Sequence, residues 1–162
     1  MYRGIEMDKI AVVDVKPQLV LGMRRIGGYE EIAPMIQKLC EFAAGKNIEM
    51  IGPPIFVCHE MTIEEVMKAF EQKNADVEVA IPISKCEESI DEVKCYELPG
   101  GKMANIIHKG PYEDCTPTYE KLYAWLEENH KNLIGPTREI YLNDPREVPP
   151  EAILTDIYAP IE

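Results

Sequence analysis

Two stretches of the chain share one pattern: GGYEEIAPMIQKLCEF at residues 27–42 and GPYEDCTPTYEKLYAW at residues 110–125. They lie 83 residues apart, and identical residues meet at six positions of this alignment. Further along the chain, the two segments that follow these stretches again become similar near their ends. A sustained repeat indicates a duplicated structural unit. We therefore infer two repeats, about 10–84 and 94–161, within a single domain that spans 1–162.

Each repeat predicts the same order of elements: a strand, a helix and two further strands. After each Gly-x-Tyr-Glu turn, apolar residues recur at helical spacing. Pro34 and Pro117 suit the first helical turn, where a missing N–H costs nothing. In the first repeat, Thr62 and Glu65 form a capping-box pattern that predicts an additional short helix over 63–72. We expect the strands at about 10–26, 54–60, 76–84, 94–109, 137–143 and 153–160.

This pattern predicts an α+β fold built from a duplicated strand-helix-strand-strand module. The two modules can pair their edges into one antiparallel-rich sheet with the helices on one face. Sheet twist would leave the other face concave. Because clefts between repeated units are common ligand sites, we expect a ligand cleft on that concave face.

Composition and charge exclude several classes of protein. No apolar run approaches the roughly 20 residues of a membrane span. The N-terminus shows no basic region followed by an apolar core, so we expect no signal peptide and a cytoplasmic location. The net charge is −12, and the longest basic run is Arg24-Arg25. A duplex-binding surface needs clustered Lys and Arg, so direct nucleic-acid binding is not expected.

The five cysteines are irregularly spaced, at 40, 58, 86, 95 and 115. An odd number without CxxC spacing is typical of reduced thiols rather than of a disulfide framework. The histidines and cysteines also lack the spacing of a zinc site. We therefore expect no metal and no other cofactor.

One carboxylate breaks the apolar pattern of a predicted strand. GPTREIYLND at residues 135–144 carries Glu139, where GPPIFVCHE at residues 52–60 carries Phe56. Strand alternation places Glu139 and Tyr141 on one face. If the intervening Ile140 packs under the helices, both side chains point into the concave face.

These residues resemble the GyrI-like small-molecule-binding domain, which also forms the effector-binding part of some AraC-type and MerR-type transcription regulators. The resemblance spans nearly the whole chain. It rests on Gly110-Pro-Tyr-Glu113, Tyr119 to Leu126, Gly135 to Pro145 and Leu154 to Pro160.

The resemblance implies a ligand pocket between the two repeats. In that family an acidic residue of the Arg-Glu-x-Tyr strand faces the pocket, and aromatic residues surround it. Multidrug-sensing members use it to recognise lipophilic cations. By position the acidic residue is Glu139, with Trp125, Tyr141 and Tyr112 nearby, and Phe56 is the repeat counterpart that completes our candidate set. No helix-turn-helix segment precedes the module, so we expect a stand-alone module that is not itself a DNA-binding regulator.

Other interpretations of the same residues stay open at this point. A carboxylate among aromatic rings is costly to bury unpaired, so Glu139 could instead form an ion pair with a neighbouring base. The assumed strand parity could also be inverted. Tyr112 has a repeat partner in Tyr29, which favours a structural role at the turn. Trp125 fits either the core or the pocket.

We expect a protein that binds small, hydrophobic, cationic molecules and acts as a sensor or a sequestering module. A hydrolase is the alternative, because stand-alone members of the resembling family hydrolyse reactive cyclopropane-containing toxins. In that case Glu139 and Tyr141 would be catalytic, with the carboxyl acting as general acid or base. Inhibition of gyrase or of another protein by the acidic surface is a third hypothesis. A protein partner or a homodimer is compatible with the sequence.

Overall fold

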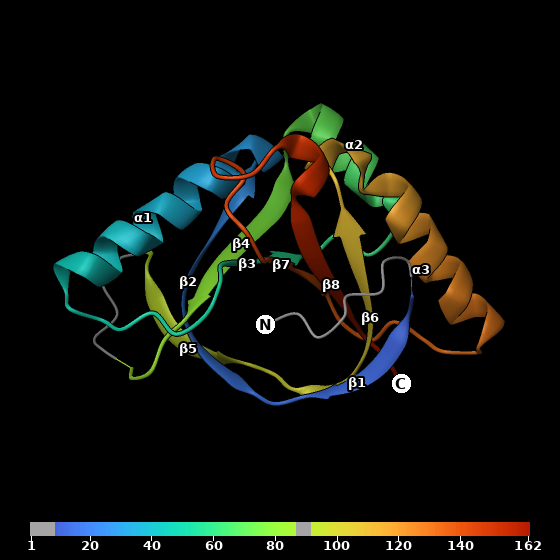
Figure 1. Ribbon diagram of the computed structural model, residues 1–162, viewed down its shortest axis with the longest axis horizontal. Helices are drawn as coiled ribbons and strands as arrows, with labels where there is room; N and C mark the ends of the chain where they lie inside the picture. The colour runs from blue at the N-terminus through green and yellow to red at the C-terminus, as the bar shows by residue number, and fades with distance from the viewer. Residues whose placement is uncertain (1–8, 87–91) are drawn as a thin grey trace.

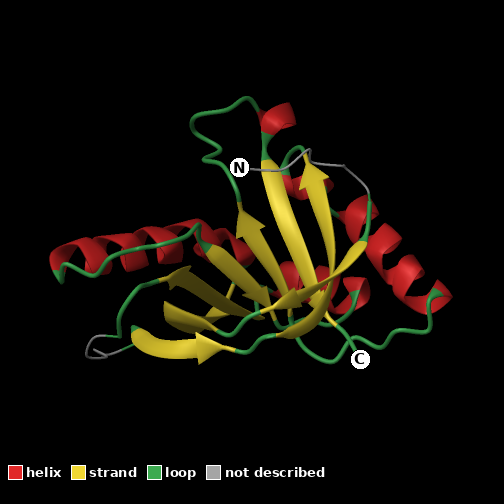
Figure 2. Cartoon of the chain, turned by 60° about the horizontal axis from the view of Figure 1, so that its bottom comes forward, coloured by secondary structure: helices red, strands yellow, loops and turns green. Residues whose placement is uncertain are grey.

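A computed structural model describes residues 9–86 and 92–162, which form an antiparallel eight-stranded sheet and three α-helices. The predicted α+β class is therefore confirmed. Figure 2 shows the strands as one curved sheet with helices beside it. The strands are β1 (Ala11–Val15), β2 (Gln18–Gly27), β3 (Ile55–Cys58), β4 (Ala75–Pro82), β5 (Lys94–Leu98), β6 (Gly101–Lys109), β7 (Thr137–Tyr141) and β8 (Leu154–Pro160). The helices are α1 (Ile32–Gly45), α2 (Ile63–Gln72) and α3 (Thr116–Glu128).

The order of the strands is symmetric about the centre of the sheet, which lies between β7 and β3. It runs β1-β6-β8-β7-β3-β4-β2-β5, with every neighbouring pair antiparallel. The elements β2-α1-β3-β4 and β6-α3-β7-β8 thus occupy equivalent places on either side of the β3–β7 pair. The duplication itself stays our inference from the sequence.

Each opening strand is divided in two, which the sequence did not predict. β1 ends before Lys16-Pro17 and β5 ends before Pro99-Gly100, because proline cannot donate a ladder hydrogen bond. After the break the chain changes partners: β1 pairs with β6, and β5 pairs with β2. The two exchanged arms run along the lower edge of the molecule in Figure 1. They approach closely, since a Cβ at Gly100 would lie 2.3 Å from the carbonyl oxygen of Val15.

Two apolar cores lie under the two long helices. α1 buries Met35, Leu39 and Ala43 against β2, β3 and β4. α3 buries Leu122 and Leu126 against β6 and β8. In Figure 1 the two helices flank the sheet, and α2 lies between them at the top.

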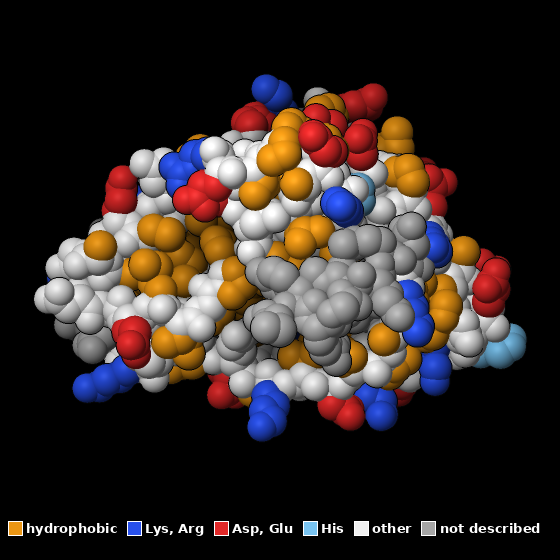
Figure 3. Space-filling view, viewed as in Figure 1, with side chains coloured by type: hydrophobic (Ala, Val, Ile, Leu, Met, Phe, Trp, Pro, Cys, Tyr) orange, Lys and Arg blue, Asp and Glu red, His pale blue; other side chains and the backbone are white. Residues whose placement is uncertain are grey.

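The short helix α2 begins where the capping pattern predicted. The Thr62 hydroxyl accepts a hydrogen bond from the Glu65 backbone N–H at 3.0 Å. Its residues Met67 and Phe70 are 63% and 66% exposed. Figure 3 shows hydrophobic and acidic side chains together at this end of the molecule.

The cysteine prediction was wrong for one pair. Cys86 and Cys95 form a disulfide with a Cα–Cα distance of 5.8 Å, while Cys40, Cys58 and Cys115 are free. The sheet order explains this pairing, because β4 and β5 lie on either side of β2 and bring the two cysteines together.

Within residues 9–86 and 92–162, no helix is long and apolar enough to cross a membrane.

Candidate functional site

Glu139 lies in the middle of an otherwise apolar row that crosses the sheet. Strand register places Phe56 on one side of it and Ile157 on the other. The row continues through Val79 on β4 to Met23 on β2. Phe56 belongs to the core under α1, and Ile157 belongs to the core under α3. Glu139 therefore sits where the two cores meet, on the face of the sheet that carries the helices.

The prediction that Glu139 and Tyr141 point away from the helices was wrong. The two side chains do share a face, but it is the helix-bearing face. Ile140 packs on the opposite face with Ile55 and Val57. The exchanged arms supply that face with its own apolar cover, including Leu98. The expected orientation of Glu139 and Tyr141 presupposed that only one face of the sheet is apolar. The second core makes both faces apolar, and the two side chains point to the face opposite to the expected one.

Two tyrosine hydroxyls hold the carboxylate of Glu139. Tyr119 of α3 donates to Oε2, and Tyr141 of the same strand donates to Oε1 at 3.3 Å. The ring of Tyr112 meets Tyr141 edge-on, with 5.3 Å between ring centroids and 64° between ring planes. Glu139, Tyr119 and Tyr141 are all half-buried, so they keep some contact with solvent. The sequence candidates Glu139, Tyr141 and Tyr112 are thus brought together.

Loss of hydration dominates the electrostatics of this cluster. Burial raises the pKa of Glu139, although the hydrogen bonds from Tyr119 and Tyr141 and the nearby His108 act in the opposite direction. Burial also raises the pKa of both tyrosines well above its usual value, so their hydroxyls remain donors. Across residues 9–86 and 92–162, no lysine or arginine forms an ion pair with Glu139. The described residues therefore do not form the structural ion pair with Glu139 that the sequence had left open.

Phe56 continues the site into the first repeat. It is buried, and the ring of Tyr29 meets it edge-on with 6.1 Å between centroids. The Tyr29 hydroxyl donates to Glu60 Oε1 at 2.8 Å. The other oxygen of Glu60 accepts the Asp76 backbone N–H at 3.1 Å. Tyr29 therefore links Phe56 to a second carboxylate.

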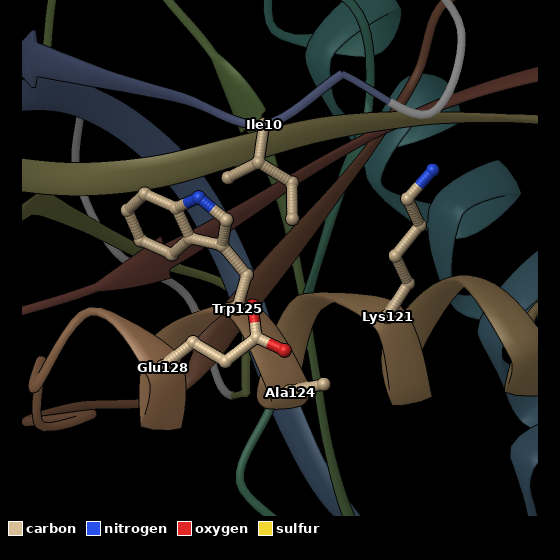
Figure 4. Close-up of a pocket in the computed structure, with 5 residues that line it drawn as sticks. All are labelled: Ile10, Lys121, Ala124, Trp125 and Glu128. Atoms are coloured by element: carbon tan, nitrogen blue, oxygen red, sulfur yellow. The ribbon is translucent and has the colours of Figure 1, made fainter.

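Trp125 lies elsewhere on α3. It lines a separate hollow of about 310 Å³, which Figure 4 shows together with Ile10, Lys121, Ala124 and Glu128. None of the tyrosines around Glu139 lines this hollow. Helix geometry accounts for the separation, because six residues advance a helix by about 9 Å and turn it by roughly 240°. Tyr119 and Trp125 consequently point in different directions.

Tyr119 was not among the site residues expected from the sequence, and Tyr29 was expected to have only a structural role at its turn. A signal for Tyr119 was present in the repeat. At the separation that pairs Tyr29 with Tyr112, Tyr119 falls opposite Ile36, and Tyr141 falls opposite Cys58. The positions that differ between the repeats are therefore the ones that supply polar groups around Glu139.

A second buried carboxylate shows what a paired one looks like in this fold. Glu78 is 7% exposed and lies on the face without helices. It bonds His59 Nε2 at 2.6 Å and accepts the Tyr96 hydroxyl at 2.5 Å. Burial alone would raise the pKa of Glu78, but these two hydrogen bonds and the charges of His59 and Arg24 outweigh burial, so its pKa is lowered. A hollow of about 460 Å³ adjoins Glu78 and Tyr96.

The two carboxylates predict opposite effects of amide substitution on stability. Because the pKa of Glu139 is raised in the folded state, its contribution to stability is complete below the unfolded pKa and is lost as pH rises through the folded pKa. Glu139→Gln should therefore raise the free energy of unfolding near neutral pH, by about 0.5–2 kcal/mol, the usual size for a stabilising substitution. Urea unfolding measured from pH 4 to pH 8 checks this.

Glu78→Gln is the matched control. The pKa of Glu78 is lowered in the folded state, so its stabilising contribution exists above the unfolded pKa and is lost as pH falls. This variant should be less stable than the wild type near neutral pH. Destabilisation of both variants by the same amount would contradict our description of Glu139.

Solved structures with the same fold belong to proteins of several kinds. EcmrR in complex with DNA aligns with a TM-score of 0.83 and 19% identity, over 95% of this chain and 57% of the EcmrR chain. This chain thus spans just over half of that protein. The isolated EcmrR C-terminal domain aligns with a TM-score of 0.78 and 20% identity, over 95% of this chain and 97% of the domain.

Two further structures cover almost the whole chain. A hydrolase encoded by lin2189 of Listeria innocua aligns with a TM-score of 0.68 and 18% identity, over 96% of this chain and 93% of its own. SAV2435 bound to tetraphenylphosphonium aligns with a TM-score of 0.62 and 11% identity, over 95% of this chain and 94% of its own. At these identities the similarity establishes the fold only.

A search of curated proteins found no match. The sequence profile of the GyrI-like small molecule binding domain matches residues 8–162. This match confirms the resemblance inferred from the sequence motifs. With the profile covering nearly the whole chain and the fold agreeing with it, the protein belongs to the GyrI-like small-molecule-binding domain family.

Proposed function

We propose that this protein binds small, hydrophobic, cationic molecules on the helix-bearing face of its sheet and pairs their charge with Glu139. The observation that carries the proposal is the state of that carboxylate. It is half-buried between two apolar cores, is held by two tyrosine hydroxyls, and forms no ion pair with a lysine or arginine of the described residues. A cationic ligand would supply the charge partner that the described residues do not.

The surrounding rings suit the same class of ligand. Tyr119, Tyr141 and Tyr112 adjoin Glu139, and each ring can attract a cation through its negative face. One such contact contributes about 0.5–2 kcal/mol, and more of that range is realised where water is excluded. Apolar parts of the ligand would pack against Phe56 and the adjoining core. Charge and hydrophobic area are therefore both recognised at one place.

Ionisation of Glu139 couples binding to pH. Burial favours its protonated form in the free protein, whereas a bound cation favours the carboxylate. Cation affinity should consequently increase as pH rises through the raised pKa of Glu139. A neutral ligand lacks this coupling, so pH dependence separates charge recognition from hydrophobic binding.

Relatives with the same fold fit this proposal in two ways. SAV2435 is described as bound to tetraphenylphosphonium, which is a lipophilic cation. EcmrR is described in complex with DNA, and its C-terminal domain is the part that corresponds to this chain. We propose the role of a ligand sensor or a sequestering module for this chain.

Hydrolysis of a reactive electrophile is the second candidate function. The raised pKa of Glu139 favours it, because such a carboxyl can donate a proton when protonated or accept one from an attacking water when ionised. Tyr141 would orient the carboxyl and the substrate. The fold is shared with a protein described as a hydrolase from Listeria innocua.

The binding proposal predicts discrimination by charge. In isothermal titration calorimetry at neutral pH, tetraphenylphosphonium should bind, and the neutral triphenylphosphine oxide should bind more weakly. Glu139→Gln should lower the affinity for the cation by about tenfold or more, because it removes the charge attraction between the carboxylate and the phosphonium, which is on the order of 1–4 kcal/mol at a partly buried site. Glu78→Gln should keep the wild-type affinity. Equal affinity for both ligands, or an unchanged cation affinity in Glu139→Gln, would overturn the proposal.

Turnover of an electrophile tests the hydrolase candidate separately. A cyclopropane-containing alkylating compound is incubated with the protein, and mass spectrometry follows the addition of water. The candidate predicts repeated turnover that is lost in Glu139→Gln and reduced in Tyr141→Phe. Recovery of unchanged compound, or a rate equal to that in buffer alone, would eliminate it.

A further inference from the structure

We infer that the site accepts dications, with Glu139 reading one charge and Glu60 reading the other. The inference rests on the proposed function, because it assigns a ligand class to the same site. It assigns a second carboxylate, Glu60 of the first repeat, to pair with a charge of the ligand. A molecule with two cationic groups joined by an apolar linker would engage both repeats at once.

Glu60 resembles Glu139 in its surroundings. It follows the end of β3, is half-buried, and accepts the hydroxyl of Tyr29 at 2.8 Å. Its second oxygen accepts the Asp76 backbone N–H at 3.1 Å. Over the described residues no lysine or arginine forms an ion pair with Glu60. Like Glu139, Glu60 combines a tyrosine donor with the absence of a basic partner.

Two other carboxylates, Asp76 and Glu92, already have basic partners. Glu92 lies 2.5 Å from the guanidinium of Arg25 and 2.7 Å from the ammonium of Lys38. Asp76 lies 2.6 Å from the guanidinium of Arg24. Glu60, which is half-buried, differs from these two carboxylates in having no basic partner among the described residues.

Aromatic rings connect the two carboxylates. The ring of Tyr29 meets Phe56 edge-on, and Phe56 lies directly opposite Glu139 across the β3–β7 pair. Cys58, between Phe56 and Glu60 on β3, points to the same face of the sheet. Both carboxylates act electrostatically on Tyr29 and on Cys58. The linker of a dication would therefore run over Phe56 and the ring of Tyr29.

Strand geometry sets the length of the ligand. Four residues separate Phe56 from Glu60, which corresponds to about 13 Å in a fully extended strand. Since Glu139 lies directly opposite Phe56 across the strand pair, the same length of about 13 Å along the strand direction sets the scale of the separation between the two carboxylates. Flexible bis-quaternary ammonium compounds of graded length cover this distance.

The experiment compares ligands that differ in one charge. Calorimetry measures hexamethonium, decamethonium and the monocation decyltrimethylammonium against the full chain. The variants are Glu60→Gln, Tyr29→Phe and Glu139→Gln. Glu127→Gln, which changes an exposed side chain of α3, is the control for net charge. Tyr29→Phe keeps the ring and the charge of Glu60 but removes the hydrogen bond between them.

We expect at least one dication to bind more tightly than the monocation. Glu60→Gln should lower the affinity for that dication by about five- to tenfold, which corresponds to roughly 1–1.4 kcal/mol. The same variant should change the affinity for the monocation by less than about twofold. Glu127→Gln should preserve the preference for the dication, and Tyr29→Phe, which leaves the charge of Glu60 in place, should reduce that preference less than Glu60→Gln does. Glu139→Gln should weaken every cation.

Two kinds of failure are distinguishable. If the monocation binds through Glu139 but no dication exceeds it, or if Glu60→Gln weakens both ligand types equally, Glu60 is structural and the dication inference falls alone. If neither ligand type binds, or if Glu139→Gln has no effect on either, the proposed function falls and this inference falls with it.

Discussion

The carboxylate of Glu139 occupies a place in the sheet where every neighbour in its row is apolar. Burying a charge at such a place is costly unless hydrogen bonds and a partner charge compensate for lost hydration. The structure supplies the hydrogen bonds through Tyr119 and Tyr141, but no basic side chain of the described residues pairs with Glu139. Glu78 on the opposite face, with His59 and Tyr96, shows that this fold can compensate a buried carboxylate well enough to lower its pKa. The incomplete compensation at Glu139 is the basis of our proposal that a cationic ligand pairs with it.

The position of Glu139 also depends on the near-symmetry of the two repeats. The β3–β7 pair lies at the centre of the sheet, and α1 and α3 lie over the two flanking halves. A residue at this centre is reached from both repeats: Tyr119 comes from the second, and Phe56 with Tyr29 from the first. Glu139 aligns with Phe56 and Tyr119 aligns with Ile36, whereas Tyr29 and Tyr112 are an aligned identical pair. The candidate site therefore combines positions that the repeats share with positions at which they differ.

Local features of the fold could be predicted from the sequence because they depend on local chemistry. The helical spacing after each Gly-x-Tyr-Glu turn identified α1 and α3, and the Thr62–Glu65 pattern identified α2. The pairing of Glu139 with Tyr141 on one face followed from strand alternation alone. The family resemblance supplied Tyr112 as a neighbour of that pair, and the structure places it there.

Long-range features could not be predicted in the same way. The division of each opening strand and the exchange of β1 and β5 depend on pairing between residues far apart in the chain. This exchange covers the second face of the sheet, which reversed the expected direction of Glu139. The Cys86–Cys95 disulfide likewise depends on the order of β4, β2 and β5. Trp125 was ambiguous because its direction depends on how α3 sits on the sheet.

The titration of Glu139 tests the central claim most directly. Selective ¹³C labelling of glutamate side-chain carboxyls, with Glu139→Gln to assign the resonance, gives the pKa of this one group in solution. The account predicts a pKa above the ordinary value of about 4.3 in the free protein and a clear decrease when tetraphenylphosphonium is bound. A pKa at or below the ordinary value in the free protein, or one that saturating cation leaves unchanged, would contradict it.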